Sequence, residues 1–252
     1  MASWFSERGR RNGGRVSISV RQLLVPFLAT AGIVCFSSAE AADQQRAAVT
    51  WAGVHGAESR APGASVKGVA ASGDVALVAE WIMQNHRNGG FPFVIADKAN
   101  GRLYAFHENG ELFAEARALY GAMRSDVMTQ EQADKALRDL SVSDMITPAG
   151  IFNAQPYESR AYGPAVRFAR FSHSNLLIHR APIEWRRRYL DSSRTGRNRV
   201  TYGCINVLPK FMDETLLPAL RRGAMLVVLP ETQSARSFFG IAINNGGATA
   251  PL

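Results

Sequence analysis

The clearest hydrophobic pattern lies between residues 93 and 119 and predicts three consecutive strands. Short runs rich in apolar residues, "FVIAD", "RLYAF" and "ELFAEARAL", are separated by the turn sequences "KANG" and "ENG". Runs of this length bounded by Gly and Asn are typical of strands joined by tight turns. The pattern therefore predicts a three-stranded meander.

Helical spacing of apolar residues appears in two places in the first half of the chain. Residues 74–86 have apolar residues at helical spacing after Asp74, which could serve as the N-cap. Thr129 and Gln132 have the spacing of a capping box, which predicts a surface helix over residues 130–140.

The second half of the chain alternates strand-like and helix-like patterns. "AVRFARFSHSNLLIHRAP" (165–182) predicts either two strands or one long bent strand, and a basic loop follows it. Residues 208–223 begin with a proline in a first-turn position and end at Gly223, which indicates a helix that Pro218 must kink or split. "AMLVVLPE" (224–231) predicts a buried closing strand.

The N-terminal segment has the order of an export signal. Five arginines and then an apolar run precede the A-x-A pattern that ends at Ala41, so residues 1–41 are expected to be a signal peptide. An uncleaved anchor is the alternative, and the export route is left open. Residues 42–73 read as a flexible Ala/Gly/Ser-rich leader, residues 74–231 as one folded domain with its core at 91–231, and residues 232–252 as a tail with weak signals.

Export changes the meaning of the charge. The net charge of +8 would favour nucleic acid in a cytosolic protein, but residues 1–41 carry +3 of it, which leaves about +5. A basic protein outside the cytoplasm more plausibly meets anionic envelope polymers. We therefore expect the periplasm and the cell wall, no nucleic acid, and no stable membrane span after signal cleavage.

Signal cleavage would leave a single thiol in an oxidising compartment. The chain has two cysteines, of which Cys35 lies in the signal and Cys204 in "TYGCIN". An unpaired cysteine in an exported protein indicates reactivity, although a buried inert residue is the alternative. Gly203 permits close approach of a carbonyl, and its N–H and that of Cys204 could hold an oxyanion.

A nucleophilic thiol needs a base, and two of the five histidines precede the cysteine segment on strand-like sequence. His173 and His179 would share one face of an unbroken strand. His179 is favoured because it follows the apolar "NLLI" and lies at the start of a loop. A surface or structural role remains open for either residue.

Three segments together, "TPAGIF" (147–152), "IH" (178–179) and "TYGCIN" (201–206), resemble the L,D-transpeptidases. The resemblance covers about residues 91–231 in segments. It implies a mainly β fold with a few helices, a sandwich of mixed sheets. It also implies that Cys204 is the nucleophile, His179 the base, Gly203 part of the oxyanion loop, and Thr201 and Asn206 residues that shape the site.

Two departures from the family pattern concern the substrate site. Tyr202 stands where many members have histidine, so His179 acts alone or Tyr202 lends its hydroxyl. Cys204 follows His179 by 25 residues, a longer spacer than usual, and the insertion is rich in arginine. Some of these arginines, Arg180 and Arg199 first among them, could grip substrate carboxylates, or the segment could be a solvated loop. The other candidates are Arg186, Arg187, Arg188, Arg194 and Arg197.

The resemblance implies acyl transfer in the cell wall without a metal or organic cofactor. Cys204 would attack the carbonyl of the third, diamino acid residue of a peptidoglycan tetrapeptide stem and release D-Ala. The amine of a second stem peptide, or of an envelope protein, would resolve the thioester. A hydrolase using water at the same site and a non-catalytic wall-binding module are the alternatives.

Overall fold

The computed structural model describes residues 72–191 and 197–242. The expected signal peptide and all but the last two residues of the expected leader lie outside this part of the chain, so both stay predictions. In the described part, no helix combines the length and the apolar character needed to cross a membrane.

The fold is mainly β, with mixed sheets and a few helices, as predicted. The strands are β1 (Phe93–Asp97), β2 (Arg102–Phe106), β3 (Leu112–Arg117), β4 (Tyr120–Gly121), β5 (Gly150–Ser159), β6 (Gly163–Arg170), β7 (Asn175–Arg180), β8 (Arg199–Thr201), β9 (Ile205–Val207) and β10 (Ala224–Val228). Eight of them form one sheet in the order β3-β2-β1-β10-β5-β6-β7-β9, and β4 pairs with β8. The β1–β10, β7–β9 and β4–β8 pairs are parallel and the others antiparallel.

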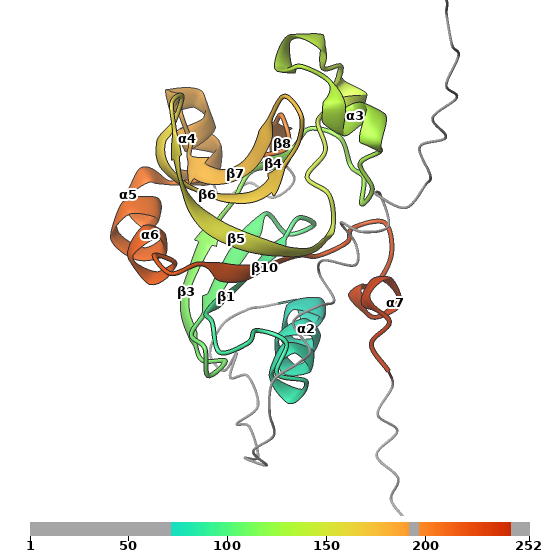
Figure 1. Ribbon diagram of the computed structural model, residues 1–252, viewed down its shortest axis with the longest axis vertical. Coiled ribbons are helices and arrows are strands. Elements are labelled where there is room, and N and C mark those ends of the chain that lie inside the picture. Colours follow the sequence, from blue (N-terminus) through green and yellow to red (C-terminus); the bar gives the residue numbers. More distant parts are fainter. Residues whose placement is uncertain (1–71, 192–196, 243–252) are drawn as a thin grey trace, which may run out of the picture. The chain divides into compact units, whose positions relative to one another are not determined.

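Strand β5 belongs to both halves of the large sheet. Its first half pairs with β10 and its second half with β6, so the strands from β3 to β10 and the strands from β6 to β9 face each other (Figure 1). The main core lies between the halves, where Val94 and Leu226 meet Phe168, Ile178 and Ile205. This arrangement is the predicted sandwich, and the predicted meander is its β1–β2–β3 part.

A second core covers the other face of β1. Because side chains alternate along a strand, Val94 faces the first core while Phe93 and Ile95 face helices α2 (Gly73–Gln84) and α7 (Ala235–Phe239). Trp81 of α2 and Phe239 of α7 have ring centroids 5.9 Å apart. Part of the tail, residues 235–239, therefore packs with the domain, although its sequence carries only weak signals.

The two predicted N-terminal helices both form, with different ends. Ser72, and not Asp74, caps α2, because its hydroxyl accepts from the N–H of Val75. The capping box at Thr129 is confirmed, but α3 (Gln130–Asp134) is short and two 3-10 turns, η1 (Leu137–Asp139) and η2 (Val142–Asp144), follow it. Within α3 only Ala133 is buried, so packing does not extend the helix to residue 140.

In the second half of the chain the structure shows how residues 165–182 fold and what happens to the helix that contains Pro218. Residues 165–182 form two strands, β6 and β7, and His173 lies in the turn between them. The predicted helix forms as α5 (Pro209–Phe211), a π-turn η3 (Met212–Leu216) and α6 (Leu217–Ala219) in direct succession, so its irregularity is a π-turn just before Pro218 and not a break at the proline. The buried closing strand is β10.

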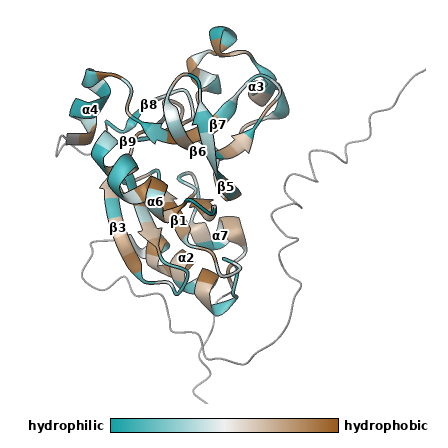
Figure 2. Cartoon of the chain, turned by 60° about the vertical axis from the view of Figure 1, so that its left-hand side comes forward, coloured by the Kyte–Doolittle hydropathy of each residue, from teal (hydrophilic) through white to brown (hydrophobic). Residues whose placement is uncertain are grey.

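The basic segment after β7 contains a helix where a loop was expected. Helix α4 (Glu184–Asp191) is largely hydrophilic in Figure 2. Its buried Leu190 packs with Leu119 and Ala181. This apolar contact fixes α4 beside the end of β7, from which His179 projects.

Candidate active site

Parallel pairing of β7 with β9 places His179 directly opposite Asn206. The imidazole Nε2 lies 3.0 Å from Asn206 Nδ2, and Nδ1 lies 2.8 Å from the backbone oxygen of Arg180. Since a carbonyl oxygen only accepts, Nδ1 carries the proton and Nε2 accepts from the Asn206 amide. Burial lowers the pKa of His179 to about 4, and the nearby Arg186 adds to the fall, so the ring is neutral at pH 7.

Two threonine hydroxyls hold the turn before Cys204. Thr201 Oγ1 donates to the Cys204 carbonyl at 2.6 Å and accepts from Gly203 N–H at 3.2 Å. Thr147 Oγ1 donates to the Gly203 carbonyl at 2.8 Å and accepts from Gly121 N–H at 2.8 Å. Thr147 of the first motif therefore supports the third motif directly.

Gly203 is required by the geometry of this turn. Its φ of 118° is a conformation that residues with a Cβ rarely adopt. A Cβ at this position would also lie 2.5 Å from the Ile146 backbone oxygen. The Gly203 amide already donates to Thr201, so an oxyanion role for it requires that bond to be given up.

Cys204 is half-buried and unpaired. Its thiol donates to the backbone oxygen of Asn175 at 3.8 Å. Burial raises the thiol pKa to about 11, although the Leu177 N–H and the Arg186 charge oppose the rise. Within residues 72–191 and 197–242 no hydrogen bond joins Cys204 to His179, so the resting pair is a neutral thiol and a neutral imidazole.

Tyr162 is a site residue that sequence reasoning missed. It lies in the β5–β6 turn, and its ring stacks on His179 with centroids 3.8 Å apart and 15° between the planes. Burial raises the pKa of the Tyr162 hydroxyl, and Cys204 contributes to the rise, so thiol, phenol and imidazole are close. Only the turn sequence "YG" marks this position, and it carries no chemical signal.

Arg186 is the cation of the site, although Arg180 and Arg199 were the arginines expected there. Arg180 forms an ion pair with Asp213 and donates to the Pro164 carbonyl at 2.9 Å. Arg199 forms an ion pair with Glu231 and donates to the Lys98 carbonyl at 3.2 Å. These ion pairs give both side chains structural partners, whereas the Arg186 guanidinium lies within 3.4 Å of Asn206 Oδ1.

The rim of the site is aromatic. Tyr202 and Trp185 are exposed at 46% and 44% of their surface. The Arg186 guanidinium carbon lies 5.9 Å from the Tyr202 ring centroid and 5.3 Å from that of Trp185. Tyr202, which replaces a second histidine, thus faces solvent beside a cation.

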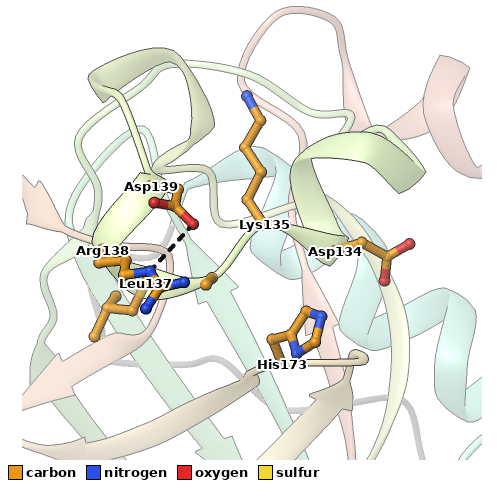
Figure 3. Close-up of a pocket in the computed structure, with 7 residues that line it drawn as sticks. Asp134, Lys135, Leu137, Arg138, Asp139 and His173 are labelled. Carbon is orange, nitrogen blue, oxygen red and sulfur yellow. Dashed lines mark ion pairs between the residues drawn. The ribbon is translucent and has the colours of Figure 1, made fainter. Parts of the chain in front are cut away.

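His173, the alternative base, lies elsewhere. It lines an open pocket of about 600 Å³ together with residues 134–139 (Figure 3). The His173 ring is exposed in the β6–β7 turn, outside the contacts of Cys204. In the part of the chain that the structure describes, no three His, Cys, Asp or Glu side chains form a group that could hold a metal ion.

A comparison with protein families identifies the family of the chain. Residues 92–228 match the YkuD family, the L,D-transpeptidase catalytic domain. The chain belongs to this family. The resemblance carried by the three motifs is therefore confirmed, and L,D-transpeptidases act on peptidoglycan stem peptides.

Solved structures include L,D-transpeptidases at low identity. Pgp2 from Campylobacter jejuni, a helical cell shape determining protein, is 15% identical with a TM-score of 0.39 over 57% of this chain and 49% of that one. The E. faecium L,D-transpeptidase catalytic domain is 17% identical with a TM-score of 0.33, covering 56% and 98%. L,D-transpeptidase 1 of Mycobacterium tuberculosis is 17% identical with a TM-score of 0.32, covering 55% and 61%.

The chain spans about half the length of Pgp2. A comparison with curated proteins found no match.

A buried ion cluster supports the L,D-transpeptidase motif turn from behind. Lys98 Nζ donates to the Thr147 carbonyl at 3.0 Å, to Asp126 Oδ1 at 3.0 Å and to the Ser125 carbonyl at 2.9 Å. Glu231 lies 3.7 Å from the same nitrogen. A lysine in the turn after β1 gives no sequence signal of burial, so this support could not be foreseen.

Proposed function

We propose that this L,D-transpeptidase family member is an exported, cysteine-dependent enzyme of the periplasm that transfers an acyl group from a peptidoglycan tetrapeptide stem to an amine. The observation that carries the proposal is the β7–β9 pairing. It sets His179 opposite Asn206 in the motif strand, two residues after the only free thiol among the described residues.

The first step is proton transfer from Cys204 to His179. Nε2 has the available lone pair because Nδ1 keeps its proton on the Arg180 carbonyl. The thiol must turn from the Asn175 carbonyl toward the ring, and the hydrogen bond from the Asn206 amide to His179 Nε2 must break. The Arg180 carbonyl then stabilises the imidazolium, as the group that orients the histidine does in cysteine and serine hydrolases.

The remaining steps balance without a cofactor. The thiolate attacks the carbonyl carbon of the third residue, and the Cys204 N–H faces the developing oxyanion. The bond to D-Ala breaks, and His179 protonates the leaving amine. The acceptor amine then attacks the thioester, forms the new amide and releases the Cys204 thiol after its proton passes through His179.

Intact-protein mass spectrometry after treatment with a carbapenem tests the thiol chemistry. The wild-type protein should gain the mass of one drug molecule, because ring opening forms a thioester at Cys204. Cys204→Ala should gain nothing, and His179→Gln should react at least about 100-fold more slowly. An unmodified wild-type protein that still binds sacculi would instead indicate a wall-binding module.

Muropeptide analysis of wall material incubated with the enzyme tests the acceptor. A new cross-linked dimer joined between two diamino acid residues supports transpeptidation. A stem shortened by one residue with no dimer would show that water resolves the thioester, and a protein attached to muropeptide would show an envelope-protein acceptor.

A further inference from the structure

Arg186 is a buried cation that has no counter-ion among the described residues. Only 8% of its surface is exposed. Its Nε makes no hydrogen bond, and its Nη1 reaches Asn206 Oδ1 at 3.4 Å, longer than an ordinary N–H···O bond. None of the ion pairs between described residues involves Arg186.

The residues around Arg186 supply no negative charge at neutral pH. His179 is neutral because its pKa is lowered, and the Cys204 thiol is neutral because its pKa is raised. Tyr162 is neutral for the same reason as the thiol. Burying a guanidinium with free donors costs free energy unless an anion satisfies them, so the arrangement fits an anion that arrives with a ligand.

The shape of the site points to a planar anion near the sulfur. Arg186 bonds to Asn206, two residues after Cys204, and its guanidinium lies over the ring of Tyr202, two residues before it. A guanidinium presents paired donors that match a carboxylate. The exposed rings of Trp185 and Tyr202 offer apolar cover to the small side chain beside such a group.

We propose that Arg186 binds the C-terminal carboxylate of the stem peptide, on the residue that leaves when Cys204 is acylated. This inference rests on the proposed function. In a tetrapeptide stem this carboxylate lies one residue beyond the carbonyl that the thiolate attacks. Arg186 is then the residue that selects stems ending in a free carboxylate at the fourth position.

Binding to the Cys204→Ala variant tests the assignment without turnover. Isothermal titration calorimetry compares a synthetic tetrapeptide stem with the same peptide ending in a carboxamide. The carboxylate form should bind about 10- to 100-fold more tightly, the range of a charged hydrogen-bonded contact. Arg186→Gln in the same background should remove this preference and leave the affinity for the carboxamide within about threefold.

Two further variants control the result. Arg188→Gln makes the same charge change on the exposed face of α4 and should keep the full preference. Arg186→Lys keeps the charge without the paired donors and should retain only part of the preference. It also supplies the test if Arg186→Gln does not fold.

Each other outcome overturns the assignment. Equal binding of the two peptides would do so, as would a preference that survives in Arg186→Gln. A shift of the pH profile of Cys204 alkylation in Arg186→Gln, with the carboxylate preference unchanged, would assign the cation to the sulfur instead. Failure of the proposed function is seen separately, as absence of turnover and of a carbapenem adduct in the protein with Cys204 and Arg186 intact.

Discussion

Lys98 and Arg186 are both buried cations close to the motif turn, but their surroundings are opposite. Lys98 is fully buried and places its three protons on Asp126 and two backbone oxygens. Arg186 is almost as buried, yet one of its nitrogens has no partner. A satisfied buried charge holds structure in place, whereas the unsatisfied Arg186 fits the ligand that we propose for it.

The largest effect is expected from Lys98→Met. The change leaves the buried Asp126 without its cation, whereas Glu231 keeps its ion pair with Arg199, and it should lower the free energy of unfolding by about 3 to 5 kcal/mol. Urea denaturation measures the loss. Lys210→Met is the matched control, since Lys210 pairs with Glu214 at 4.0 Å on the surface and should change nothing measurable. Equal stability of the two variants would contradict a structural role for Lys98.

Stability should depend on pH through His179, whose pKa is lowered by burial and by the nearby Arg186 charge. Its folded pKa of about 4 lies below the ordinary 6.5, so between these values the unfolded chain binds more protons. The contribution is complete above pH 6.5 and is lost as pH falls through 4, by about 3 kcal/mol in total. Unfolding measured from pH 8 to 4 should show this loss in wild type relative to His179→Gln. Parallel curves would show that the ring is not held neutral.

Gly203→Ala probes the turn between the two cations. The strained φ and the contact with the Ile146 oxygen should together cost at least about 2 kcal/mol. Gly90→Ala, at a φ of 76° with open space around it, has strain alone and should lose about 1 kcal/mol. Thermal unfolding of both variants separates the two causes. If Gly203→Ala lost no more than Gly90→Ala, the turn would be looser than described.

The smallest effect on stability is expected from Arg186→Met. Because Arg186 forms no ion pair with a residue that the structure describes, an apolar side chain of similar length should change the unfolding free energy by no more than about 1 kcal/mol, in either direction. The same urea titration used for Lys98→Met measures it. A loss as large as that of Lys98→Met would remove the contrast between the two cations.

The sequence predicted the fold and the segments that carry the candidate site, but it did not predict the contacts between them. The meander, the distorted helix near Pro218 and the capping box follow from local spacing and turn chemistry, and the structure has all three. The proximity of His179 to the motif strand depends on parallel pairing between distant segments, which only the family resemblance suggested. The choice among arginines could not be made at all, since the partners of Arg180 and Arg199 come from residues 213 and 231.

The residues that sequence reasoning missed share a physical cause. Tyr162 acts through stacking and Lys98 through burial, and neither property belongs to a short motif. Helix α7 was missed because five residues with one capping serine carry little periodicity. Its stability comes from packing on α2, which the order of residues does not display.

The Thr147 hydroxyl connects two backbone segments that are far apart in sequence, because its oxygen accepts a hydrogen bond from the Gly121 N–H and donates one to the Gly203 carbonyl. The position of the turn before Cys204 is therefore coupled to that of strand β4, which contains Gly121. Thr147→Val removes the hydroxyl and should break both hydrogen bonds, whereas Thr147→Ser keeps the hydroxyl and should preserve them. Thr147 thus helps to fix the backbone next to Cys204 through these two hydrogen bonds.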